Sequence, residues 1–152
     1  GTNGVQSQDL IGRKTIKCNG VFMNEYITEI RDFANDLDAD LNFIKDATLD
    51  AATEIESVTQ FILEAAAENS EFSNAAAADY LHAVGLLSFS YMFARMAKAA
   101  KAKEGEFYQN KLSLALYFVQ RILPELSLRI TKVKAGSEVV MNFSEDYFTN
   151  QS

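Results

Sequence analysis

The sequence predicts an all-α fold, a bundle of about four to five helices around a central buried helix at about 74–103. The chain of 152 residues is rich in Ala, Leu, Glu and Lys and has only one proline and seven glycines, a composition that favours helix over strand. Apolar residues recur at helical spacing along several segments. No segment shows the convincing alternation of a strand, and no internal repeat is visible. A chain of this length is sufficient for one domain with its own core.

The central segment, 74–103, is apolar on most of its surface. One face carries Leu81, Val84, Leu87 and Tyr91, and further apolar side chains follow at Leu86, Phe89, Met92, Phe93 and Met96. A helix that is apolar nearly all round is expected to be buried nearly all round. It is not expected to span a bilayer, because Asp79, His82 and Arg95 interrupt the apolar run well short of ~20 residues.

Three further long helices are expected to turn an apolar stripe towards this centre. One begins after the break at Asn19-Gly20, one covers 43–68 and one covers 106–134. Their stripes are, in chain order, Met23, Tyr26, Ile27, Ile30, Phe33 and Leu37; Ile55, Val58, Ile62 and Ala65; and Tyr108, Leu112, Ala115, Leu116, Val119, Ile122 and Leu123.

Both ends of the chain and Pro124 are expected to depart from this regular pattern. Pro124 lies inside the last helix and removes a backbone donor, so that helix is expected to kink or split there. The first residues, 1–14, predict a glycine-rich turn leading into a short helix. The tail, 136–152, is expected to be irregular and to be attached to the core through Val139, Val140, Met141 and Phe143.

Charge and cysteine content exclude several classes of function. The formal net charge is −7, which argues against a nucleic-acid partner, because duplex binding requires a basic face. Cys18 is the only cysteine, so neither an internal disulfide nor a cysteine-based metal cage is expected. A reduced, cytoplasmic setting fits this composition. The sequence shows no signal peptide and no membrane span.

Individual residues give only weak signals for a site, and no metal site is expected. The segment Asp36-Leu37-Asp38-Ala39-Asp40 resembles the start of a calcium loop, but Leu41 stands where glycine is needed and Ala47 where glutamate is needed. An acidic turn between helices is therefore the favoured interpretation. His82 is the only histidine, and a core or interface histidine is favoured over a catalytic base. Cys18, beside Lys17, matches no nucleophile motif.

Two groups of motifs resemble the acyl-CoA dehydrogenase family. Gly1-Thr2-Asn3-Gly4-Val5-Gln6, followed by Asp9-Leu10-Ile11-Gly12-Arg13-Lys14, resembles a segment near the end of that family's catalytic core. Asp79-Tyr80-Leu81, Ile122-Leu123-Pro124-Glu125 and the ending from Val140 to Phe148 look like an added C-terminal helical domain found in larger bacterial members. The resemblance implies that 1–19 is the end of the catalytic helical domain and 20–152 the added bundle.

The resemblance also implies an activity for a longer parent protein. Members of the family use FAD to oxidise acyl-CoA thioesters to 2,3-enoyl-CoA, as in fatty acid β-oxidation, and pass the electrons to an electron-transfer acceptor. By the motif match, the catalytic glutamate precedes Gly1, so no catalytic residue is expected in this chain. Gly1 is expected against the substrate, and Thr2, Asn3 and Gly4 near the flavin nucleotide. The fragment alone is expected to be inactive and not to hold FAD.

An alternative is a stand-alone helical module for protein–protein interaction, with no chemistry of its own. The residues that precede Gly1 in the encoded protein would distinguish the two readings. If the chain is a fragment of the enzyme, we expect it to self-associate, because Val5, Leu10 and Ile11 would be exposed without the catalytic core, and exposed apolar patches bind partners.

Overall fold

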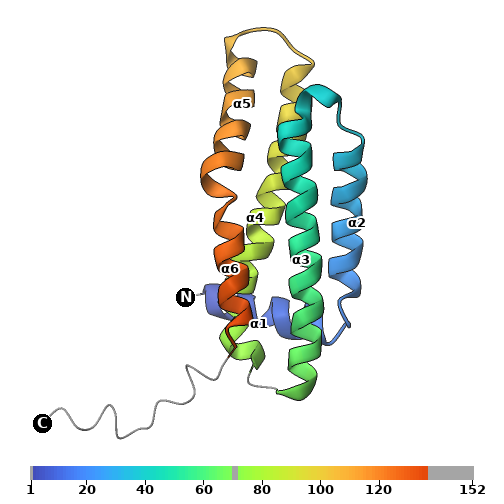
Figure 1. Cartoon of the computed structure of the whole chain (residues 1–152), viewed down its shortest axis with the longest axis vertical. Helices are drawn as coiled ribbons and strands as arrows, with labels where there is room; N and C mark the ends of the chain where they lie inside the picture. Colours follow the sequence, from blue (N-terminus) through green and yellow to red (C-terminus); the bar gives the residue numbers. More distant parts are fainter. Residues whose placement is uncertain (1, 70–71, 137–152) are drawn as a thin grey trace, which may run out of the picture.

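A computed structural model describes residues 2–69 and 72–136. The described residues form helices and connecting turns without a strand, which confirms the all-α prediction. Four long rods run alternately up and down (Figure 1), and the short helix α1 (Thr2–Gln8) crosses one end of them. The rods are α2 (Val21–Asn35), α3 (Asn42–Glu68), α4 (Phe72–Lys101) and a broken fourth rod made of α5 (Glu106–Tyr117) and α6 (Glu125–Lys134).

Helix α4 is the central helix, as predicted, and it begins and ends two residues earlier than expected. It packs against α1, α3, α5 and α6, and Ala83, Leu87 and Ala94 on its inner faces are fully buried. The expectation that it is buried nearly all round is wrong along one stripe, where Phe89 is 59% exposed and Met92 is 47% exposed. The neighbouring helices contact α4 on its other sides and leave this stripe open to solvent.

The predicted apolar stripes of α2 and α3 face the core. On α2 the side chains of Met23, Ile27 and Ile30 are buried, and on α3 those of Ile55 and Ile62 are fully buried. Buried polar side chains lie between α3 and α4 and are paired with each other. The hydroxyls of Thr59 and Tyr80 lie 2.9 Å apart, and those of Thr48 and Ser90 lie 2.7 Å apart. These pairs satisfy groups that would otherwise be costly to bury.

The fourth rod splits at Pro124, as predicted. A π-helical turn, η3 (Phe118–Ile122), precedes the proline, with the amide of Leu123 donating to the carbonyl of Phe118 at 2.9 Å. A π turn inserts one extra residue, so the inward face changes register across it. Leu116 and Ile122, both predicted to face the core, are instead 40% and 39% exposed.

The opening segment is helical from Thr2 onwards, so the expected glycine-rich turn is wrong. Helix α1 continues into a second π-helical segment, η1 (Asp9–Ile16), which contacts α2, α3 and α4. Ile11 is fully buried in these contacts, contrary to the expectation that it would be exposed, whereas Val5 is 73% exposed. The break at Asn19-Gly20 is confirmed, because both residues have positive φ.

The acidic segment after α2 forms a turn whose carboxylates are paired with lysines of α4. Asp36 accepts from Lys98 at 2.6 Å, and Asp40 pairs with Lys101. These hydrogen bonds lower the pKa of both carboxyl groups. Within residues 2–69 and 72–136, no group of three or more acidic, histidine or cysteine side chains is placed to hold a metal ion. What the structure shows of this segment is a turn between α2 and α3 with two ion pairs to α4.

The ion pair between α2 and α3 gives the fold a pH-dependent contribution to stability. Arg31 donates to both carboxylate oxygens of Glu56, at 2.8 and 3.1 Å, and this interaction lowers the pKa of Glu56. A lowered folded-state pKa means that the stabilisation is present above the unfolded pKa, about 4.3 for Glu, and is lost as pH falls through the folded value.

A double-mutant cycle of Arg31→Gln and Glu56→Gln tests this contribution. Because Glu56 is half exposed, the expected coupling free energy at neutral pH is only about 0.2–1 kcal/mol. It is expected to shrink towards zero as urea unfolding is repeated from about pH 6 down to about pH 2. A coupling energy that stays constant over that range would show that the pair does not contribute through the charge of Glu56.

Candidate functional site

The residues predicted near a flavin lie in the first turn of α1. Thr2, Asn3 and Gly4 are all exposed, and Gly1 lies outside the described residues. The hydroxyl of Ser7 donates to the carbonyl of Gly4 at 2.9 Å, and a Cβ built on Gly4 would meet nothing within 4 Å. This surface is open, so a nucleotide can contact it along one edge. One exposed helical turn cannot enclose a cofactor, and any enclosing surface must come from elsewhere.

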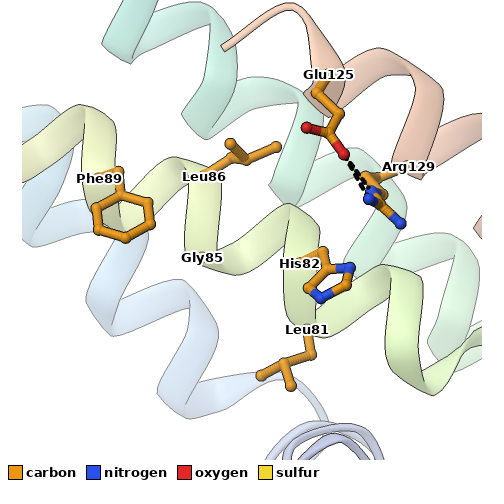
Figure 2. A pocket seen from close by; sticks show the side chains of 7 residues that line it. All are labelled: Leu81, His82, Gly85, Leu86, Phe89, Glu125 and Arg129. Atoms are coloured by element: carbon orange, nitrogen blue, oxygen red, sulfur yellow. Dashed lines mark hydrogen bonds and ion pairs between the residues drawn. The ribbon is translucent and has the colours of Figure 1, made fainter. Parts of the chain in front are cut away.

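A second candidate site is a hollow of about 420 Å³ between α4 and α6. In Figure 2, Gly85 lies between Phe89 and His82 along α4, and the ion pair of Glu125 and Arg129 on α6 lies alongside. Leu81 and Leu86 complete the lining. The missing side chain at Gly85 leaves the hollow open, because a Cβ placed there would meet nothing within 4 Å.

The polar rim of this hollow is an ion-pair cluster that joins the two helices. Arg129 of α6 donates to Asp79 of α4 at 2.9 Å and to Glu125, one turn earlier in α6, at 3.0 Å. The bonds to Asp79 and then to Glu125 raise the pKa of Arg129. The bond from Arg129 to Asp79 connects α6 to α4. Because the guanidinium also binds Glu125, its charge is compensated by two carboxylates and is not offered unpaired to an anionic ligand.

His82 is exposed and helps to line this hollow, so of the two positions expected for it, core or interface, the structure excludes the core. An interface position remains consistent with its location. Its neighbours in the lining are mainly apolar side chains and the Glu125–Arg129 pair. Cys18 is half-buried, and its thiol lies 3.4 Å from the carbonyl of Arg13.

Sequence reasoning missed the exposed stripe of α4. Its six members, spaced alternately four and three residues apart, are Ala78, His82, Gly85, Phe89, Met92 and Met96. Ala78, His82, Phe89 and Met92 are exposed, and Gly85 and Met96 are half-buried. The alternating spacing was a signal in the sequence, since it is the spacing of a seam between two helices. It was hidden because the other faces of α4 are also apolar.

An additional hollow, of about 430 Å³, lies between α1 and α4 and shares Leu81 with the first. Its lining includes the exposed Val5 and the half-buried Leu10. The two hollows therefore adjoin at Leu81, with Gln6, Asp9 and Lys14 also lining the second. None of the described helices is long and apolar enough to cross a membrane.

The described residues thus define an all-helical bundle with open hollows on the surface of α4. The particular family follows from comparison with known proteins. The chain belongs to the family described as Acetyl-CoA dehydrogenase C-terminal like, whose model matches residues 26–144. This confirms the resemblance to the C-terminal part of an acyl-CoA dehydrogenase. The match begins within α2 and so does not include Thr2, Asn3 and Gly4. No curated protein matches the chain.

Proposed function

We propose that this chain is the C-terminal part of an FAD-dependent acyl-CoA dehydrogenase that oxidises acyl-CoA thioesters to 2,3-enoyl-CoA. The family match over residues 26–144 is the observation that carries the proposal. Within that protein, 1–19 ends the catalytic helical domain and 20–152 forms the added bundle. The proposed setting is the cytoplasm, where an electron-transfer acceptor reoxidises the enzyme.

In the proposed reaction, a carboxylate that precedes Gly1 removes the α-proton of the thioester. FAD supplies the acceptor for the hydride that leaves the β-carbon. The first residues of this chain would help to position the ligands. Gly1 would lie against the substrate, where the lack of a side chain permits close approach. The exposed first turn of α1 would offer the Thr2 hydroxyl and the polar groups of Asn3 and Gly4 to the edge of the nucleotide.

The full-length protein and the 152-residue chain test this proposal together. The full-length protein should purify with bound flavin and reduce an electron acceptor when given an acyl-CoA. Replacing the glutamate before Gly1 with glutamine should abolish turnover and leave the flavin bound. The 152-residue chain should neither bind flavin nor reduce the acceptor. A few hydrogen bonds of about 0.5–1.5 kcal/mol each cannot offset the cost of immobilising a large ligand, about 4–15 kcal/mol.

Flavin titration and an acceptor-reduction assay across short and long acyl-CoAs provide the measurements. A full-length protein that is flavin-free and inactive on all of them would contradict the enzyme proposal. It would favour the stand-alone interaction module instead.

For the bundle itself we propose a structural and oligomerisation role. The support is the exposed apolar side chains Val5, Phe89 and Met92, together with two hollows that share Leu81. Large apolar side chains exposed beside such hollows are typical of a protein interface.

A further inference from the structure

We propose that the exposed stripe of α4 binds the same stripe of a second copy of this chain, with the two helices antiparallel. This inference names the partner for the oligomerisation role proposed above and rests on it. The stripe consists of Ala78, His82, Gly85, Phe89, Met92 and Met96, and it contains no aspartate, glutamate, lysine or arginine.

The hollow on α4 has the shape of a socket for one side chain of a facing helix. Where two helices pack along a seam of four-and-three spacing, each knob enters a hole made by residues i, i+3, i+4 and i+7 of its partner. Four of the residues that line the hollow have this spacing, namely His82, Gly85, Leu86 and Phe89. Gly85 contributes no side chain to this hole, and a Cβ placed there would meet nothing within 4 Å.

Phe89 is the knob that fits this hole. It is 59% exposed, so its ring already projects from α4. A cavity of ~150 Å³ can hold a benzene ring, and the hollow has about 420 Å³. Phe89 of each copy would therefore enter the hollow over Gly85 of the other, and the contact would be made twice.

Antiparallel packing follows from the distribution of sizes along the stripe. The first half carries the small residues Ala78 and Gly85, and the second half carries the large residues Phe89, Met92 and Met96. An antiparallel pair with its twofold axis beside Leu87 opposes Gly85 to Phe89, Ala78 to Met96 and His82 to Met92. A parallel pair would oppose glycine to glycine and phenylalanine to phenylalanine, leaving a void at one level and a clash at the next.

The extent of the stripe sets the expected affinity. Its six residues span 18 positions, about 27 Å at the rise of an α-helix. A contact of that length along a helix about 10 Å wide gives roughly 300 Å² per copy, whereas a stable interface needs about 800 Å². We therefore expect a weak, reversible dimer of the 152-residue chain, populated at high micromolar concentration.

Sedimentation equilibrium of the 16.9 kDa chain tests the proposal at rising concentration. The chain is expected to dimerise, and Phe89→Glu is expected to raise the dissociation constant about tenfold or more, as for an aromatic anchor of an interface. Gly85→Leu should have the same effect, because the leucine side chain would occupy the hollow on the surface of α4 without a clash at its Cβ. Phe22→Glu is the matched control, because Phe22 is 58% exposed on α2 and lies off the stripe.

Disulfide cross-linking tests whether the two copies of α4 pack antiparallel. In a Cys18→Ser background, His82→Cys and Met92→Cys proteins are mixed under mild oxidation. The antiparallel pair predicts a mixed 82–92 disulfide, and predominant 82–82 and 92–92 disulfides would overturn the orientation. A chain that stays monomeric at high micromolar concentration, or a dimer weakened by Phe22→Glu and not by Phe89→Glu, would overturn the interface. The sedimentation and disulfide results do not bear on the flavin and activity assays, which test the enzyme proposal separately.

Discussion

Replacing Leu87 with alanine is expected to lower the free energy of unfolding by about 2–5 kcal/mol. Leu87 is fully buried at the centre of α4, within the main cluster of core side chains. Truncation removes transfer free energy and leaves a cavity, because helices fixed by their other contacts cannot collapse fully around it. This is a large fraction of the roughly 5–15 kcal/mol that stabilises a typical domain.

Urea unfolding followed by circular dichroism measures this loss, with the slope of the transition checked for two-state behaviour. Leu128→Ala in α6 makes the same chemical change at a side chain that is 53% exposed. It is expected to change the free energy by no more than about 0.5 kcal/mol. Equal losses for the two variants would show that α4 is not the centre of the core.

Replacing Ala94 with leucine is expected to destabilise the fold by about 1–3 kcal/mol, here through overpacking. Ala94 is fully buried in a second cluster with Ala97, Ala115 and Ile44. The three alanines of this cluster allow α4 to approach the start of α3 and α5 closely. A larger side chain must therefore displace a helix or adopt an unfavourable rotamer.

Ala99→Leu on the same helix is the matched control, because Ala99 is exposed and alanine and leucine have similar helix propensities. It is expected to leave the melting temperature within a degree or two, whereas Ala94→Leu lowers it by several degrees, as a loss of this size does in a domain of this length. An unchanged melting temperature for Ala94→Leu would show that the contact of α4 with its neighbours is loose.

The sequence determined most of the helices and their inward faces, because helical periodicity is a local property of the chain. The stripes of α2 and α3, the break at Asn19-Gly20 and the split at Pro124 all follow from residues a few positions apart. The family was also within reach of the sequence, since two of the motifs resembling an acyl-CoA dehydrogenase extension lie inside the region that the family model matches, and the third, from Val140, lies partly inside it.

Only the tertiary structure decided which apolar side chains stay exposed. Phe89 and Leu87 are equally apolar neighbours in α4, yet one is 59% exposed and the other fully buried, because exposure depends on which sides of α4 the other helices cover. Ile11 is buried by contacts with helices distant in sequence. Ile122 turns outward because the π turn before Pro124 shifts the register of the inward face. The candidate contact site on α4 thus arises from the arrangement of helices, which periodicity alone does not specify.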